Sequence, residues 1–135
     1  MPEQTLSALE FSGLLAVVKQ YAVSDLGRRA VARLRPSADF AVIEARFQEI
    51  RELSDLMDRE GPLPLTAFPD LAPWLAKAAV PGSLLPAEAF NDLLATLRLA
   101  RQVRHYLSLG EAYCPLLAGL NARLHELTDL RQAIV

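Results

Sequence analysis

Arginine is the main cation of this chain, and its spacing gives the first chemical signal in the sequence. The 14 basic residues are 12 Arg and two Lys. The planar guanidinium of Arg suits bidentate hydrogen bonding to carboxylate or phosphate. Arg98, Arg101 and His105 fall on one face of a helix, with Arg104 beside them. The row therefore predicts a candidate nucleic-acid contact through Arg98, Arg101 and Arg104, which would line up toward a phosphate chain.

The same row also has a plainer interpretation as a solvated face, or as one side of salt bridges to a neighbouring helix. The net charge is −2 and the isoelectric point is about 5.7, so the overall basic signature of an autonomous nucleic-acid binder is missing. An Arg-rich composition also follows from a GC-rich genome. A second basic cluster comes directly after Gly27 and contains Arg28, Arg29, Arg33 and Arg35.

The sequence contains no recognisable pattern for phosphate-loop, metal or thiol chemistry. The Gly-rich loop that ends in Lys and Ser or Thr is missing, and the chain has only six glycines. His105 and His125 have no partner at metal-ligand spacing. Cys114 is the only cysteine, which excludes an internal disulfide, fits a reducing cytoplasm and favours a small buried apolar side chain. We therefore expect no cofactor and no active site within residues 1–135.

Two carboxylate pairs are the remaining candidates for acid–base chemistry. Glu49 with Glu52, and Asp55 with Asp58, all fall in one long helical pattern. Nothing in their surroundings indicates a shared proton. We expect all four to be solvated charges on the outer face of the helix.

The composition predicts helices as the elements that position these residues. Of 135 residues, 52% are apolar and 22% are charged, which is typical of a folded chain long enough to bury a core. The apolar residues include 26 Leu and 21 Ala but few aromatic residues, and Leu and Ala favour helices over strands. No apolar run approaches 18 residues, so we expect neither a membrane span nor a signal peptide, and a cytoplasmic location.

Apolar spacing and capping residues divide the chain into helices and connectors. The fold class predicted is all-α, a multi-helix bundle with two long antiparallel helices at about 39–60 and 86–109. A Pro-rich extended connector covers 61–73, and shorter helices lie at both ends, capped for example by Thr5 and Ser24. The last helix has no stop signal when the chain ends. We therefore expect a single domain over 1–135 that is a fragment of a longer protein.

Several short stretches, in order along nearly the whole chain, resemble the second group of bacterial MutS-type proteins, which lacks the mismatch-recognition domain. The stretches are Thr5-Leu6-x-x-Leu9-Glu10-Phe11, Tyr21-Ala22-x-Ser24-x-Leu26-Gly27-Arg28, Pro36-Ser37-x-Asp39, Gly61-Pro62-Leu63-Pro64-Leu65, Leu84-Leu85-Pro86-x-Glu88 and Leu97-Arg98-x-Ala100-Arg101. Within them, Leu26, Gly27, Arg28, Ile43 and Phe47 are similar to the core, or lever, domain of MutS proteins.

The resemblance implies an N-terminal core or lever domain that is cut before the clamp, the ATPase and the Smr nuclease domain. Leu26, Gly27 and Arg28 would orient and pack a helix, and Ile43 and Phe47 would belong to the core. The parent would be a homodimeric ATPase and endonuclease that binds branched DNA or collided ribosomes and suppresses homologous recombination. Its ATP and Mg²⁺ would be held downstream, and this chain would act as a non-catalytic scaffold.

An alternative function is an autonomous helical protein–protein interaction module. In that case the Pro-rich connector and the Leu-rich grooves would receive a partner helix. The sequence downstream of Val135 distinguishes the two hypotheses, because a coiled-coil arm and a phosphate loop are expected only for the first.

Overall fold

The computed structural model describes residues 10–134 and, within that range, contains helices and connecting segments but no strands. The all-α class predicted from the Leu- and Ala-rich composition is therefore correct. The predicted cap at Thr5, and the part of the first family stretch that precedes Glu10, lie outside the described residues. The helices are α2 Phe11–Gln20, α3 Asp25–Ala32, α4 Phe40–Glu60, α5 Ala72–Ala78, α6 Ala87–Leu109, α7 Pro115–Ala122 and α8 Thr128–Ile134.

The ends of several helices are set by the local chemistry of single residues. The Ser24 hydroxyl accepts a hydrogen bond from the backbone N–H of Gly27 at 3.1 Å, which begins α3. The Asp39 carboxylate accepts bonds from Ala41 and Val42, which begins α4. Gly61 ends α4 with φ at 86°, a left-handed conformation that favours glycine. Because these signals are local, the predicted long helices agree with α4 and α6 to within one residue at each end.

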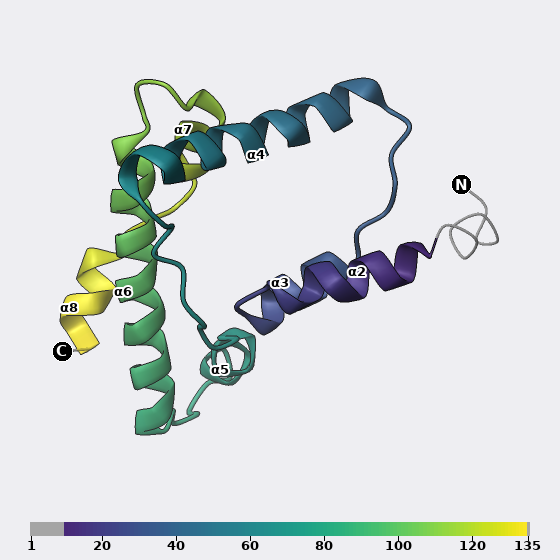
Figure 1. Cartoon of the computed structure of the whole chain (residues 1–135). Coiled ribbons are helices and arrows are strands. Elements are labelled where there is room, and N and C mark those ends of the chain that lie inside the picture. Colours follow the sequence, from purple (N-terminus) through teal and green to yellow (C-terminus); the bar gives the residue numbers. More distant parts are fainter. Residues whose placement is uncertain (1–9, 135) are drawn as a thin grey trace.

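The two long helices differ from the predicted antiparallel pair in how they meet. Figure 1 shows α4 crossing the C-terminal end of α6, with α7 in the corner between them. The extended connector and α5 separate the two helices along the chain, so no short loop forces them side by side. α7 contacts both and fills the corner.

The core of the molecule lies in this corner. Leu56 of α4 is fully buried against Tyr106 and Leu107 of α6, together with Cys114 and Leu117. A Cβ atom added at Gly110 would lie 3.1 Å from Leu56 Cδ1 and 3.3 Å from Cys114 Sγ, so a side chain there would require these neighbours to shift. The Tyr106 hydroxyl donates to the carbonyl oxygen of Gly61, which ties the start of the connector to α6.

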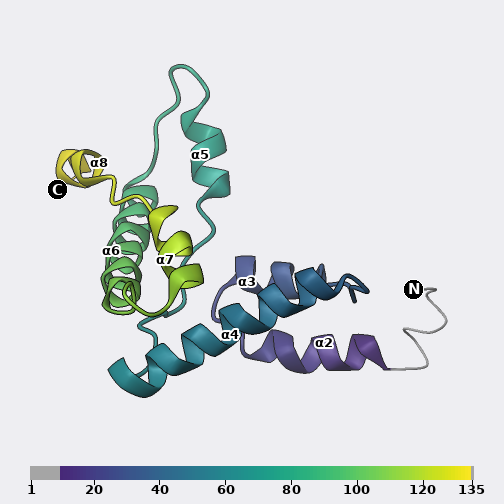
Figure 2. The ribbon, with the colours of Figure 1, turned by 90° about the horizontal axis from the view of Figure 1, so that it is seen from above.

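The remaining helices are attached more loosely. α2 and α3 pack against each other as a hairpin that stands apart from the corner, as both views show (Figures 1 and 2). α5 is linked to α6 by a hydrogen bond of 2.9 Å from the Trp74 indole N–H to the Asp92 carboxylate. The molecule is consequently open: its accessible surface is 9946 Å², whereas a compact monomer of this mass has about 7000 Å².

Candidate nucleic-acid interface

A groove of about 1000 Å³ runs beside α6 and brings the predicted arginines together. Its lining comes from α6, the turn after it, α7 and the segment that leads into α8. The α6 residues in the lining include Arg98, Arg101, Arg104 and His105. α8 packs against α6 and adds Arg131 to the same groove.

The orientation of α6 follows from its apolar residues. Leu99, Tyr106 and Leu107 are buried on the other side of the helix, and Leu97 is buried between the positions of Arg101 and Arg104. The arginine side of the helix turns toward the groove. Helical spacing then places Arg98, Arg101 and His105 in one row, as the sequence predicted. Arg98 and Arg101 are exposed, and Arg104 is half-buried.

The groove arginines keep their charge available to a ligand. Within residues 10–134, Arg98, Arg101 and Arg104 take part in none of the ion pairs and none of the side-chain hydrogen bonds. The described residues thus contain no ion pair to this row, although Glu111 and Glu126 line the same groove, and the exposure of Arg98 and Arg101 also fits the plainer interpretation of a solvated face. The groove therefore contains three arginines and one histidine of α6 and one arginine of α8, and guanidinium groups are suited to binding phosphate.

The groove is not lined by cations alone. The acids Glu111 and Glu126 and the amide of Asn121 also belong to its lining. The side-chain oxygen of Asn121 is buried and has no hydrogen-bond partner among the described residues. None of these residues was predicted as part of a site. Asn121 and Glu126 come near the arginines only through the packing of α7 and α8 against α6, whereas Glu111 lies in the turn directly after α6.

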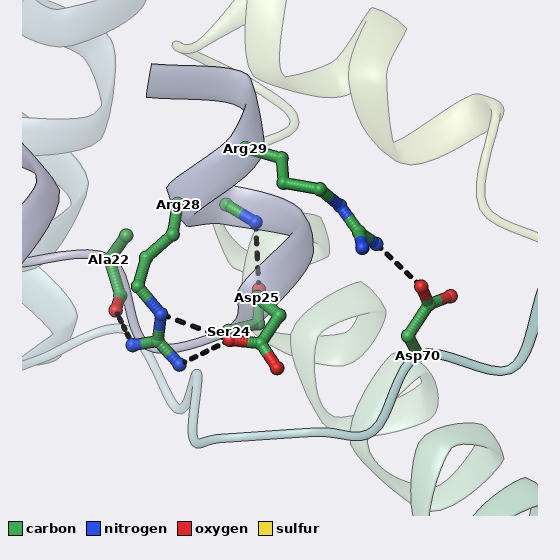
Figure 3. A network of polar contacts seen from close by, with 7 residues as sticks. Ala22, Ser24, Asp25, Arg28, Arg29 and Asp70 are labelled. Carbon is green, nitrogen blue, oxygen red and sulfur yellow. Dashed lines mark hydrogen bonds and ion pairs between the residues drawn. The ribbon is translucent and has the colours of Figure 1, made fainter. Parts of the chain in front are cut away.

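The second basic cluster is used within the fold instead. The Arg28 guanidinium bonds to the Asp25 carboxylate at 2.9 Å and to the carbonyl oxygen of Ala22 at 2.9 Å (Figure 3). Arg29 reaches across the molecule to the Asp70 carboxylate. Arg35 bonds to nearby backbone carbonyl groups. Within this cluster, Arg28, Arg29 and Arg35 thus have structural partners.

The residues singled out by the family resemblance differ in how far they are buried. At Gly27 an added Cβ would lie 3.3 Å from the Ser24 hydroxyl, so the close approach expected there is made by the α2–α3 turn. Ile43 is half-buried, whereas Leu26 is 44% exposed and Phe47 is 54% exposed. Phe47 thus differs from the core position expected, and among the described residues the one helix with extensive contacts to α4 is α7.

One carboxylate lies where the sequence did not place it. Glu52, expected on the solvated outer face, is 3% exposed and accepts hydrogen bonds from the backbone N–H groups of Leu116 and Leu117 at 2.9 and 3.0 Å. The carboxylate thereby satisfies the free donors at the start of α7. The sequence did contain a sign of this burial, because Glu52 lies one turn before the apolar Leu56 on the same face of α4.

No helix in the described part of the chain is long and apolar enough to cross a membrane. No model of a protein family matches the sequence.

The chain is similar to parts of much longer bacterial proteins. The endonuclease MutS2 of Bacillus velezensis is 32% identical over 108 residues, which are 80% of this chain and 14% of that protein. The endonuclease MutS2 of Staphylococcus carnosus is 30% identical over 99% of this chain and 18% of its own length. That of Halalkalibacterium halodurans is 29% identical over 98% of this chain and 17% of its own. The chain thus spans less than a fifth of these relatives, and the similarity supports a piece of a MutS2-family protein.

Proposed function

We propose that this chain is a non-catalytic helical scaffold of a MutS2-family DNA-processing protein, and that its groove contacts nucleic acid through Arg98, Arg101 and Arg104. The observation that carries the nucleic-acid part is the convergence of these unpaired arginines with Arg131 in one groove. The planar guanidinium is pre-organised for phosphate, so an arginine loses less side-chain freedom per hydrogen bond than a lysine does. The relatives are endonucleases of the MutS2 type, and this supports nucleic acid as the polyanion.

The scaffold or lever role is supported by how the described residues are arranged. The helices form an open frame with many exposed apolar side chains, Phe40, Phe47 and Ile50 of α4 among them. Such faces need other parts of a protein to cover them. Long helices joined at a tightly packed corner also transmit rigid-body movement.

The chemistry of the whole protein belongs to the rest of the parent chain in this proposal. There we place the ATPase with its ATP and Mg²⁺, the Smr endonuclease and the homodimer contacts. The parent would act in the cytoplasm on branched DNA or collided ribosomes and suppress recombination. This chain would supply the frame and one nucleic-acid contact.

Fluorescence anisotropy with labelled oligonucleotides tests the contact directly. The triple variant Arg98→Glu, Arg101→Glu and Arg104→Glu is expected to lower affinity at least tenfold at low salt. It should also make the dependence of log affinity on log salt shallower by about 2, since about 0.7 is lost per phosphate contact with a single strand.

A matched control changes the net charge equally but leaves the groove intact. The triple variant Lys19→Glu, Arg33→Glu and Lys77→Glu alters exposed residues outside the groove. Its affinity should fall much less. Equal losses in the two triple variants, or a wild-type chain that binds no nucleic acid at low salt, would refute the contact.

A second candidate function is the protein–protein interaction module, which a different groove favours. α4 and α7 border a groove of about 480 Å³. Its apolar lining includes Ile50, Leu53 and Leu120, and the charged residues Arg46, Glu49 and Arg123 also line it. A partner helix could lay its apolar face there. Ile50→Asp would abolish binding of such a partner and leave the oligonucleotide affinity of the α6 groove unchanged, which separates the two functions.

A further inference from the structure

We propose that two copies of this chain pair by placing helix α2 of each copy on helix α4 of the other. The inference is independent of the nucleic-acid contact, and it adds a contact between copies to those placed in the rest of the parent. It is carried by two apolar helix faces. Among the described helices, α2 and α4 each expose three or more large apolar residues, whereas each of the others exposes one or two.

The first face belongs to α2. Its apolar residues recur at spacings of three and four, which places on one side of the helix Leu14, Val17, Val18 and, at the helix end, Tyr21. All four residues are exposed. α3 packs against α2 but leaves this face open to solvent. The hairpin therefore presents the apolar side of an amphipathic helix.

The second face lies on the N-terminal half of α4. It consists of Phe40, Ile43, Phe47 and Ile50, of which all but the half-buried Ile43 are exposed. Leu56, the α4 residue of the core, follows Phe47 by nine residues, or two and a half turns, so the face points away from the core. From Phe40 to Ile50 the helix axis advances by about 15 Å at about 1.5 Å per residue. The ten residues of α2 match this length.

The hairpin of the same copy is held away from the α4 face. Figure 1 shows the hairpin separated from α4, and the Arg29 guanidinium fixes it to Asp70, which precedes α5. Residues 34–39, between α3 and α4, form neither helix nor strand. Pro36 disfavours a helical conformation at Arg35, so this segment resists shortening into a turn that would draw the two faces together. The α2 helix of a second copy has neither constraint.

A second copy covers both faces with one kind of contact. In a two-fold dimer, α2 of the first copy lies on α4 of the second and the reverse contact forms at the same time, so the assembly closes at two copies. The chain has about 2900 Å² more accessible surface than a compact monomer of its mass. A standard interface covers about 800 Å² on each partner. The uncovered surface is thus sufficient for a stable dimer.

Sedimentation equilibrium of the 1–135 chain measures this dimer. Val17→Asp in α2 and Phe47→Asp in α4 should each weaken dimerisation about tenfold or more, because each buries an unpaired charge in the contact. Val80→Asp is the matched control: it makes the same change at a residue that is 58% exposed, against 52% for Val17, and lies on neither face. The control should dimerise as the wild-type chain does. Circular dichroism checks that every variant keeps the helical content of the wild type.

A mixture of the two variants identifies the contact itself. A Val17→Asp copy keeps its α4 face, and a Phe47→Asp copy keeps its α2 face. A mixed dimer therefore contains one undamaged contact, whereas a dimer of either variant alone contains none. The mixture should associate several-fold more tightly than either variant does by itself.

Four results would overturn the proposal. They are a strictly monomeric wild-type chain, a control as weak as the two variants, a loss caused by only one of the two variants, and a mixture no tighter than its components. A loss from Val17→Asp alone would indicate an α2–α2 contact, and a loss from Phe47→Asp alone an α4–α4 contact. None of these results changes the oligonucleotide affinity expected of the α6 groove, so the proposed nucleic-acid contact stands or falls separately.

Discussion

The Glu52 carboxylate joins two helices through the backbone. It is buried on α4 and accepts hydrogen bonds from the first free N–H groups of α7. A negative charge at that end of a helix is also favoured by the helix dipole. Cys114 lies beside it, with its thiol 3.5 Å from the backbone oxygen of Glu52. The corner of the fold therefore depends on one charged side chain as well as on apolar packing.

Glu52→Ala is expected to lower the free energy of unfolding by about 2 kcal/mol, because two charge-assisted hydrogen bonds are lost and their buried donors are left unpaired. Urea denaturation followed by circular dichroism measures the change. Glu49→Ala is the control, since its side chain lies on the same helix and is 46% exposed. Equal destabilisation by the two variants would contradict the role of Glu52.

Cys114 should react slowly with thiol reagents in the native protein. Burial raises the pKa of the Cys114 thiol, and the nearby Glu52 carboxylate raises this pKa further. The native state therefore favours the protonated thiol. The stability that this preference contributes is present below the thiol pKa of the unfolded chain and is lost as pH rises from there through the raised native pKa. Ellman's reagent at about pH 7 to 9 should react far faster in urea than in buffer. Equal rates in the two conditions would show that the thiol is accessible.

Among the ion pairs and hydrogen bonds of residues 10–134, the pair between Arg29 and Asp70 joins the α2–α3 hairpin to the rest of the molecule (Figure 3). The hydrogen bond from Arg29 lowers the pKa of Asp70, and the backbone N–H of Ala72 lowers it further. The stability contributed by the ion pair is thus present above the carboxyl pKa of the unfolded chain. It is lost as pH falls through the lowered pKa of Asp70 in the folded chain. The position of the hairpin should therefore depend on this one contact.

Asp70→Asn is expected to broaden the distribution of distances between spin labels attached at Ser12 and Ser54. Asp25→Asn is the matched control, because it removes an ion pair that lies entirely within the hairpin. Acidification of the wild-type chain should reproduce the effect of Asp70→Asn. A distribution that stays narrow in Asp70→Asn would show that other contacts hold the hairpin.

The isolated chain exposes far more large apolar side chains than it buries. We expect self-association that increases with concentration, because association removes these surfaces from water. Sedimentation velocity over a wide concentration range measures it. Strictly monomeric behaviour at high concentration would contradict this expectation.

Helix ends could be predicted from the sequence, while the arrangement of the helices could not. Ser24, Asp39 and Gly61 act on their own neighbours, so their roles are visible in the sequence. The apolar spacing that contains Phe47 identifies a face of α4 but not whether another helix covers it. The arginine row followed from helical spacing alone. Asn121 and Glu126 join the groove only through the tertiary packing of α7 and α8, which the sequence does not show.

The exposed segment between α3 and α4 makes the hairpin separable by a protease. Arg33 and Leu34 are both exposed at its start, whereas the next arginine precedes Pro36, and trypsin does not cut before proline. Exposed connectors with few contacts are preferred cleavage sites. Brief digestion should therefore cut after Arg33 and release the hairpin from an otherwise intact helical corner, which then becomes a smaller unit for crystallisation.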